Sequence, residues 1–276
     1  PRLTDFRTNV SDGCELRPIA VEDLLGRPQT ALDRTAMRKL IAGQRVMITG
    51  AGGSIGSELV RQISDLEPAS VLLLDNGEFN LYAIDMELSE RHPAMPRKAI
   101  LADVRDARRI TAVIAADTPQ LVFHAAALKH VPLVEANPLE GVHTNILGTV
   151  NVADACVQTG VTVMVLISTD KAVNPTSIMG AAKRVAERYC QSLDVAPANG
   201  GPQTRFVTVR FSNVLGSTGS VVPLFQKQLA RGGPLTVTHP DMKRFFMTTG
   251  EAVQLVLQAS ALGSQGSGNE GKIYVL

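Results

Sequence analysis

The sequence has no tryptophan, only three tyrosines and three cysteines, and a formal net charge of +1 over its 276 residues. Cys14, Cys156 and Cys190 show no Cys-x-x-Cys spacing. They therefore exclude a disulfide framework and a zinc site of that kind, and they indicate a reducing compartment. The five histidines form no ligand pattern, so no metal site is expected.

Concentrated charge and long apolar runs are missing too. Nucleic-acid binding needs a dense basic surface, and the densest basic cluster here, Arg105, Arg108 and Arg109, is interpreted as a solvated helix face. We therefore expect no nucleic-acid partner. No apolar run approaches the roughly 20 residues of a membrane span, and no signal peptide opens the chain. With 45% hydrophobic and 19% charged residues, the composition is that of a globular α/β chain.

The most informative segment is a strand, loop and helix pattern over residues 45–66. An apolar run ends in glycines, and apolar residues then recur at three- and four-residue intervals. Gly50 can adopt backbone angles that other residues avoid, Gly53 leaves space for a pyrophosphate, and Gly56 allows the helix to pack closely on its strand. The N-terminus of that helix would bind phosphates. A simple tight turn is the alternative for the glycines alone.

A second apolar strand closes on Asp75, about 20 residues after the glycines, where dinucleotide sites place a carboxylate for the ribose 2′-hydroxyl. Because a carboxylate repels a 2′-phosphate and no Arg or Lys follows closely, NAD is favoured over NADP. Asp103 is predicted to accept from an adenine amino group or to cap a helix. Small residues at the end of the fourth strand leave room for a flat cofactor. The cofactor-binding residues predicted here or from the resemblance given below are Gly50, Gly53, Ser54, Ile55, Gly56, Asp75, Asn76, Asp103, Val104, Ala125, Ala126, Lys129 and Lys183.

Strand and helix patterns alternate along most of the chain. Strands are predicted at 46–49, 71–75, 98–102, 121–125, 161–167 and 205–210, and helices at 55–66, 78–90, 107–116, 138–158 and 177–193. Strands joined by helices pair in parallel through right-handed crossovers, so the expected fold is a doubly wound, Rossmann-type parallel sheet.

Three parts are predicted. Residues 1–44 form a lead-in with one helix, residues 45–211 the NAD-binding domain, and residues 212–276 a small substrate-binding part with helices near 221–231 and 249–262. The chain begins at Pro1 and stops within a strand-like segment, which predicts a piece of a longer protein with a truncated substrate-binding part.

Several motifs together resemble the extended short-chain dehydrogenase/reductase superfamily. They are Thr49-Gly-x-x-Gly-x-x-Gly56, His124-Ala-Ala-Ala, Ser168-Thr-Asp-Lys171 and Lys183. A finer resemblance is to its nucleotide-sugar 4,6-dehydratase branch, in particular bacterial polysaccharide-biosynthesis enzymes that act on UDP-N-acetylglucosamine. It is carried by Leu128-Lys-His-Val-Pro-Leu133, Asn174-Pro-Thr176, Asn213-Val-Leu-Gly-Ser-Thr-Gly-Ser220, Met242-Lys-Arg-Phe-Phe-Met247 and Glu22-Asp-Leu-Leu-Gly26.

Longer members of that branch carry transmembrane helices before this domain. The resemblance therefore implies the cytoplasmic catalytic domain of an inner-membrane protein, with membrane contact only through segments outside this chain and with homo-oligomerisation left open.

The resemblance also implies a reaction. NAD takes the C4 hydride of the sugar, a base removes the C5 proton, an acid protonates the departing C6 hydroxyl, and the hydride returns to C6. It implies Asp170 as the acid and Lys171 as the base. Burial would have to move both pKa values toward neutrality. A helix-capping aspartate beside a solvated lysine is the alternative. Lys183 is implied to bind the nicotinamide ribose.

One position departs from the superfamily pattern. Most members carry Tyr four residues before the helix Lys, whereas this chain has Met179, which cannot carry a proton. Tyr189 lies on the wrong helix face to replace it. Many membrane-linked dehydratases share this Met, and core filling is its alternative role. The candidates for the C4-hydroxyl base are Asp170, Lys171 and a water relay, with Ser168 or Thr169 in support.

The substrate is expected to bind through Lys129, Asn213, Ser220, Val221 and Arg244. The Gly/Ser loop before Val221 leads into a helix whose N-terminus suits a UDP diphosphate. Arg244 could add a bidentate phosphate contact, and Lys129 resembles a sugar-contacting residue of the family. Solvated surface positions are the alternatives for both. The predicted activity is that of an NAD-dependent UDP-N-acetylglucosamine 4,6-dehydratase, a lyase. A nucleotide-sugar 4-epimerase and a non-catalytic NAD-binding regulator are the alternatives.

Overall fold

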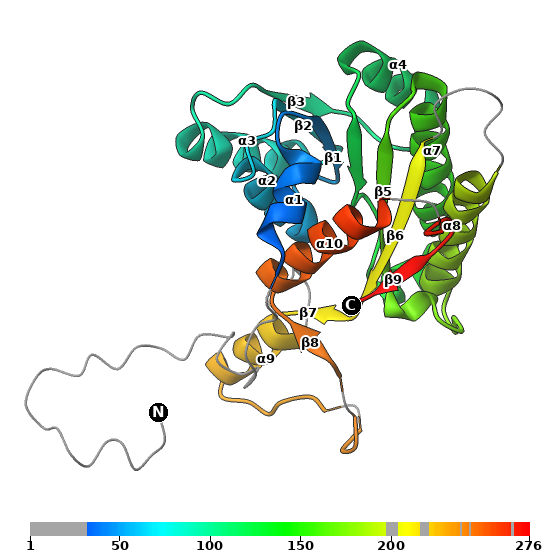
Figure 1. Ribbon diagram of the computed structural model, residues 1–276. Helices are drawn as coiled ribbons and strands as arrows, with labels where there is room; N and C mark the ends of the chain where they lie inside the picture. The colour runs from blue at the N-terminus through cyan, green and yellow to red at the C-terminus, as the bar shows by residue number, and fades with distance from the viewer. Residues whose placement is uncertain (1–31, 197–203, 216–220, 238, 243, 266–267) are drawn as a thin grey trace, which may run out of the picture.

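The protein is built around a seven-stranded parallel sheet (Figure 1). The computed structural model describes residues 32–196, 204–215, 221–237, 239–242, 244–265 and 268–276. The strand order is β3-β2-β1-β4-β5-β6-β9. The strands are β1 (Arg45–Thr49), β2 (Ser70–Asp75), β3 (Arg97–Leu101), β4 (Leu121–His124), β5 (Val163–Thr169), β6 (Arg205–Phe211) and β9 (Ile273–Val275). The order reverses between β1 and β4, so the predicted doubly wound fold is confirmed.

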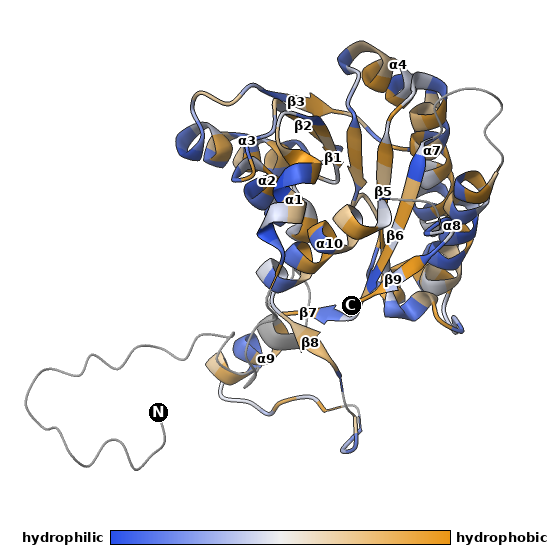
Figure 2. Cartoon of the chain, in the orientation of Figure 1, coloured by the Kyte–Doolittle hydropathy of each residue, from blue (hydrophilic) through white to orange (hydrophobic). Residues whose placement is uncertain are grey.

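Helices cover both faces of the sheet (Figure 1). On one face lie α1 (Arg34–Ile41), α2 (Ser54–Ser64), α3 (Glu78–Arg91) and α10 (Thr249–Gly263). On the other lie α4 (Ala107–Asp117), α7 (Gly148–Thr159) and α8 (Ile178–Val195). Successive residues of a strand alternate between the two cores: Val46 and Ile48 pack in the first, and Met47 packs in the second. The strands are accordingly hydrophobic, whereas α3 and α8 carry hydrophilic residues along their length (Figure 2).

The predicted helix at 138–158 is confirmed in its extent, because α6 (Pro138–Val142), a π-helix η3 (His143–Leu147) and α7 follow one another without a break. The π-turn in its middle and the short helix α5 (Val131–Ala136) before it were not predicted. Pro132 and Pro138 each stand in the first turn of a short helix, which suits them because Pro lacks the N–H that a helix interior requires. Asn137 between them has a φ of −135°, so α5 and α6 cannot be continuous.

The region 212–276 forms a small second sheet and also adds a helix and a strand to the main sheet. Short strands β7 (Asn213–Val214) and β8 (Phe246–Met247) pair in parallel as a second sheet, with α9 (Val221–Ala230) between them in the chain. Helix α10 then packs against α1 and α2, and β9 adds to the edge of the main sheet beside β6. The last two elements therefore complete the layers of the larger sheet, and a substrate-binding role for this region stays a prediction.

The lead-in contains the one predicted helix, α1, whose N-cap Asp33 accepts a hydrogen bond from Ala36 N at 3.0 Å. The Glu22–Gly26 motif lies outside the described residues. Across the described ranges, no helix has both the length and the apolar character that a membrane crossing needs.

Candidate active site

The loop between β1 and α2 depends on two glycines for its shape. Gly50 has a φ of +69°, and a Cβ there would lie 2.6 Å from Ala126 N in the segment after β4. A Cβ on Gly56 would lie 1.8 Å from the carbonyl oxygen of Gly50, so α2 reaches this loop only with glycine at that position. These are the backbone properties that the sequence predicts. Phosphate contact through Gly53, Ser54 and Ile55 stays a prediction.

The carboxylate of Asp75 is oriented by two backbone amides. Gly52 N donates to Oδ2 at 2.9 Å, and Gly77 N donates to Oδ1 at 2.8 Å. A Cβ on Gly52 would lie 2.5 Å from Asn80 Cβ, so this position also requires glycine. Because each carboxylate oxygen has a further lone pair, Asp75 can still accept from a ribose hydroxyl. The glycine pattern in the sequence did not single out Gly52 or Asn80. The hydrogen bond from Gly77 to Asp75 could have been predicted, because an Asp two residues before a Gly is typical of an Asx turn.

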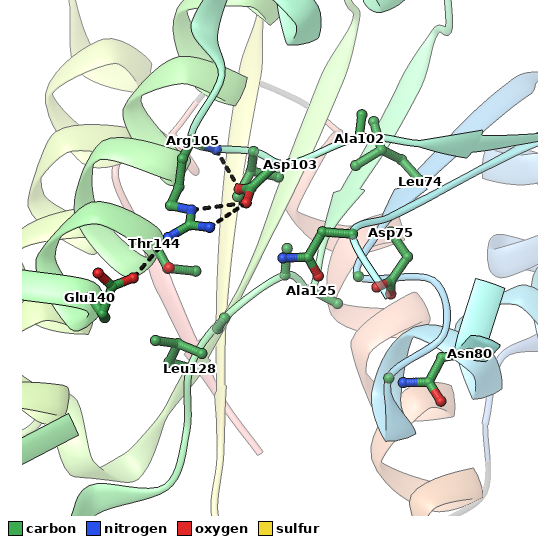
Figure 3. A pocket seen from close by; sticks show the side chains of 16 residues that line it. Leu74, Asp75, Asn80, Ala102, Asp103, Arg105, Ala125, Leu128, Glu140 and Thr144 are labelled. Carbon is green, nitrogen blue, oxygen red and sulfur yellow. Dashed lines mark hydrogen bonds and ion pairs between the residues drawn. The ribbon is translucent and has the colours of Figure 1, made fainter. Parts of the chain in front are cut away.

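A cavity of about 340 Å³ opens at the carboxyl ends of β1 to β4 (Figure 3). The structure brings most of the predicted cofactor residues together in its wall, namely Gly50, Gly53, Asp75, Asn76, Asp103, Val104, Ala125 and Ala126. Ser54, Ile55, Gly56, Lys129 and Lys183 are not part of that wall. Ligands of doubly wound sheets bind at this edge, where the strand order reverses.

Asp103 does not cap a helix. Asp106 is the N-cap of α4 and accepts from Arg109 N at 3.0 Å. The carboxylate of Asp103 instead accepts from the guanidinium of Arg105 at 2.6 and 2.9 Å, and this hydrogen bond is the main reason that its pKa lies below the usual range. Arg105 lies before α4 and lines the cavity, so its assignment to a solvated helix face is wrong.

His124 is a buried structural link between β1, β4 and α7. Thr149 Oγ1 donates to Asn145 O, so it accepts from His124 Nε2 at 3.1 Å, and His124 Nδ1 therefore accepts from Thr49 Oγ1 at 2.7 Å. Burial lowers the pKa of His124 to about 3, and the charge of Lys183 acts in the same direction. The imidazole is thus neutral at physiological pH.

Asn145 holds the segment after β4 in place. Its Nδ2 donates to Leu128 O, and its Oδ1 accepts from Leu128 N, both at 2.8 Å. This pairing comes from the π-helix, which sequence periodicity did not reveal, and π-turns often occur at functional sites. Lys129 follows directly, and burial lowers the pKa of its amine.

The predicted acid and base lie together where β5 ends. One turn of 3-10 helix, η4 (Asp170–Ala172), follows the strand, and Lys171 Nζ donates to Asp170 Oδ1 at 3.1 Å. Thr169 Oγ1 also donates to Asp170 Oδ1 at 3.0 Å. Lys171 Nζ lies 3.5 Å from Oδ1 of Asn213, so one predicted substrate residue is beside the pair. The side chains of Asp170 and Lys171 are 41% and 42% exposed.

The expected upward pKa shift of Asp170 is wrong for this geometry. Burial acts to raise the pKa of Asp170, but the hydrogen bond and charge of Lys171, with further hydrogen bonds from Thr169 and Ser212, outweigh burial and lower it. Asp170 is therefore a carboxylate at neutral pH. It also caps no helix, because the N-cap of η4 is Thr169 and that of α8 is Ser177.

Helix α8 carries Met179 and Lys183, both buried. Lys183 Nζ donates to Ile167 O at 2.8 Å. Burial lowers the pKa of Lys183 to about 8, opposed by the negative charge of Glu187. The hydroxyl of Tyr189 donates to Asp154 Oδ1 on α7 at 2.5 Å, so this hydroxyl is engaged with α7.

A buried network behind these residues was not anticipated. The carboxylate of Glu187 accepts from Arg210 Nε at 2.7 Å and Nη2 at 2.5 Å, from Ser168 Oγ at 2.6 Å, and from Arg184 Nη1 at 3.1 Å. Burial acts to raise the pKa of Glu187, but its hydrogen bonds, with Arg210 first, lower it. The hydroxyl of Ser168 is thus engaged with Glu187, while that of Thr169 lies beside Asp170. One indication of this network was present in the sequence: Glu187 lies four residues after Lys183, so the two share one face of the predicted helix.

The other predicted substrate residues are placed only in part. Asn213 Nδ2 donates to Phe245 O at 3.2 Å, which links β7 to the segment before β8. Arg244 is exposed in that segment. Ser220 lies outside the described residues, as does the side chain of Val221, the first residue of α9.

Comparison with known proteins extends this picture. Residues 46–276 match the family described as polysaccharide biosynthesis protein. The chain is 47% identical to capsular polysaccharide biosynthesis protein CapD of Staphylococcus aureus, over 100% of this chain and 45% of that protein. The chain therefore spans about half the length of that relative.

Two further relatives have more specific names. The chain is 37% identical to a UDP-N-acetylglucosamine 4,6-dehydratase (inverting) of Campylobacter jejuni, over 78% of this chain and 63% of that protein. It is 36% identical to a UDP-glucose 4-epimerase of Rickettsia rickettsii, over 82% of this chain and 65% of that protein.

Among solved structures, Pen from Bacillus thuringiensis is similar, with a TM-score of 0.74 and 35% identity over 80% of this chain and 66% of that chain. The parallel sheet, the glycine loop and the family match over residues 46–276 agree. The chain belongs to the polysaccharide biosynthesis protein family of extended short-chain dehydrogenases/reductases.

Proposed function

We propose that this chain is the catalytic domain of an NAD-dependent UDP-N-acetylglucosamine 4,6-dehydratase. It would form a UDP-4-keto-6-deoxy-N-acetylhexosamine for surface polysaccharide or glycan synthesis. The observation that carries the proposal is the Thr169–Asp170–Lys171 cluster, with Asn213 beside it, at the same sheet edge as the cavity. Similarity to the Campylobacter dehydratase supports the substrate class. We also propose that the domain is cytoplasmic and belongs to a longer inner-membrane protein.

The cavity fits a nicotinamide dinucleotide. Its wall contains the glycine loop at the N-terminus of α2, and dipole and amides there favour a pyrophosphate. Asp75 is held with lone pairs available for a ribose, and Ala125 and Ala126 leave space for flat rings. A bound nicotinamide would supply the acceptor for the C4 hydride and the donor that returns it at C6.

The Asp170–Lys171 pair supports the proton transfers. Lys171 Nζ and Asp170 Oδ1 are 3.1 Å apart, so both groups can reach one bound sugar. A base at C5 must be the neutral amine of Lys171, and a sugar ring that displaces water would favour that form because desolvation penalises a charged amine. Lys171 would then take the C5 proton, while Asp170 remains a carboxylate that can accept the C4 proton.

The base at the C4 hydroxyl is assigned to Asp170. Met179 offers no proton acceptor, while the carboxylate of Asp170 is ionised and has the Thr169 hydroxyl at 3.0 Å. A carboxylate that accepts the C4 proton then holds the proton that the C6 oxygen needs, so the proton count balances within one site. Lys183 would contact the ribose of the cofactor.

The test is a mass measurement. The full-length protein is incubated with NAD and UDP-N-acetylglucosamine, and the nucleotide sugar is analysed for loss of one water. Asp170→Asn and Lys171→Met should abolish that loss, whereas Asp117→Asn, a change of an acidic residue on α4, should not. An unchanged sugar mass with cofactor-loaded enzyme would contradict the proposal.

Epimerisation at C4 is the second candidate, favoured by the similarity to the Rickettsia epimerase. It would leave the mass unchanged and alter the stereochemistry, which proton NMR of the product sugar resolves. Binding of NAD without any UDP-sugar would instead favour a regulator.

A further inference from the structure

The first turn of α8 packs directly on the backbone of Lys171. Gly180 lies in that turn, and a Cβ on it would lie 2.3 Å from Lys171 O and 3.2 Å from Lys171 C. Ordinary van der Waals contact begins at about 3.4 Å, so a side chain here would have to push the helix and the carbonyl apart by about 1 Å. The carbonyl is part of the backbone and cannot rotate aside as the end of a side chain could. The proposed reaction uses Lys171 but gives Gly180 no role.

Two polar contacts hold this turn of α8 in place. The N-cap Ser177 accepts from Gly180 N at 3.1 Å, and Glu135 on α5 accepts from Ile178 N at 2.6 Å. They satisfy two of the four backbone N–H groups that have no partner within the helix, and the negative charge of Glu135 suits the positive end of the helix dipole. Glu135 is exposed, whereas Gly180 is buried. The turn is thus tied both to α5 and to the backbone of η4.

Lys171 is held at both ends of its backbone. Its N donates to Thr169 Oγ1 at 3.3 Å, and its carbonyl packs against Gly180. Its amine lies 3.1 Å from Asp170 Oδ1 and 3.5 Å from Asn213 Oδ1. The carboxylate of Asp170 has a separate anchor, the hydroxyl of Thr169 at 3.0 Å. A shift of the Lys171 carbonyl would therefore move the Lys171 amine more than the Asp170 carboxylate.

We propose that Gly180 and Glu135 are positioning residues for Lys171. The missing side chain of Gly180 lets the Lys171 backbone approach α8, and Glu135 holds the turn that receives it. The inference rests on the proposed function, in which Lys171 removes the C5 proton. A base must lie within hydrogen-bond reach of the proton that it takes, and a displacement of about 1 Å can lower a rate by about 10². Loss of water needs Lys171 and should depend on this contact, whereas C4 oxidation needs Asp170 and the cofactor and should not.

The main variant is Gly180→Ala in the full-length protein. Alanine favours a helix more than glycine does, so the change does not weaken α8 by itself. Single-turnover kinetics with NAD and UDP-N-acetylglucosamine separate two rates. The absorbance of the reduced nicotinamide follows C4 oxidation, and mass analysis of quenched samples follows loss of water. We expect loss of water to slow by about 10², with C4 oxidation within about twofold of the unmodified protein.

Gly250→Ala is the matched control. Gly250 also lies in the first turn of a helix, α10, but a Cβ there would meet its nearest atom, Glu58 Oε1, at 3.7 Å, which is an ordinary contact. Both rates should therefore stay unchanged in this variant.

Variants of Glu135 test the second tie. Glu135→Ala removes the acceptor for Ile178 N and should slow loss of water by about fivefold, the equivalent of one hydrogen bond. Glu135→Gln keeps an acceptor and should restore most of that rate. Glu90→Ala removes an exposed glutamate on α3 and should leave both rates unchanged.

Three results would overturn the inference. They are an unchanged loss of water in Gly180→Ala, an equal slowing of both steps in that variant, and an equal slowing in Gly250→Ala. Circular dichroism of each variant shows whether it is folded. If Gly180→Ala does not fold, the Glu135 variants decide, and an unchanged rate in Glu135→Ala then overturns the inference. If the unmodified protein removes no water from the sugar, the proposed function fails as well; if it does and the variants behave alike, only this inference fails.

Discussion

Two ion pairs lie near the carboxyl ends of β5 and β6, and they differ in burial. The carboxylate and amine of Asp170 and Lys171 are 41% and 42% exposed, and each has few partners. The pair of Glu187 and Arg210 is 0% and 10% exposed, and Ser168 and Arg184 complete its hydrogen bonds. The first pair can exchange a proton with a ligand, whereas the second ties β5, β6 and α8 together. Residue type alone does not separate a pair that a ligand can reach from a structural one; burial and the number of partners do.

The Asp170→Asn variant gives the strongest test of the difference between the exposed and the buried pair. We expect its kcat to fall by about 10³, since general acid–base groups contribute factors of this order. The Tm should change little, because an exposed ion pair contributes at most about 1 kcal/mol. Steady-state kinetics and calorimetry measure the two effects. A variant with near-normal kcat, or with a large loss of Tm, would contradict the assignment.

Glu187→Gln should show the reverse behaviour. It leaves Arg210 buried without its counter-charge, and removal of one partner from a buried pair costs about 3 kcal/mol or more. For a chain of this size we expect Tm to fall by roughly 10 °C. Glu90→Gln on the exposed face of α3 is the matched control and should leave Tm unchanged. Equal Tm values for the two variants would show that the network is not structural.

The buried His124 should make the stability of the folded protein depend on pH. Its pKa is lowered from 6.5 to about 3 in the folded protein. Below pH 6.5 the unfolded chain takes up a proton that the folded protein does not, so stability is lost as pH falls from 6.5 toward 3. At pH 5 this loss is about 2 kcal/mol. His124→Gln should flatten the slope of unfolding free energy between pH 6.5 and 5 in urea titrations. An unchanged slope would mean that other groups account for it.

The smallest effect is expected for Arg184→Gln. Arg184 is 32% exposed and reaches Glu187 at 3.1 Å, while Arg210 remains as the principal partner. We expect a loss of at most about 1 kcal/mol. Urea unfolding of each single variant and of the double variant Arg184→Gln/Glu187→Gln gives the coupling free energy between the two residues. If Arg184→Gln lost as much unfolding free energy as Glu187→Gln, Arg184 rather than Arg210 would be the main partner of Glu187.

Much of the site was predictable because it depends on local spacing. The glycines require particular backbone angles, the strand and helix periods predict a parallel sheet, and Asp75 follows at a set distance. The acid and base are adjacent in sequence, so Asp170 and Lys171 had to lie together. The helix at 138–158 was also predicted in its extent, but the π-turn within it and the short helix α5 before it were not, because helical periodicity does not reveal a single wider turn.

The sequence by itself determined the fold class, the position of the glycine loop and the adjacency of Asp170 and Lys171 at a strand end, because these follow from residue properties within one strand or turn. The tertiary structure alone decided which partners those residues have. It joined Arg105 to Glu140 and Ser168 to Glu187 across distant segments, and it lowered the pKa of Asp170 against expectation. Periodicity describes the local backbone, whereas pairing and desolvation depend on how the layers pack.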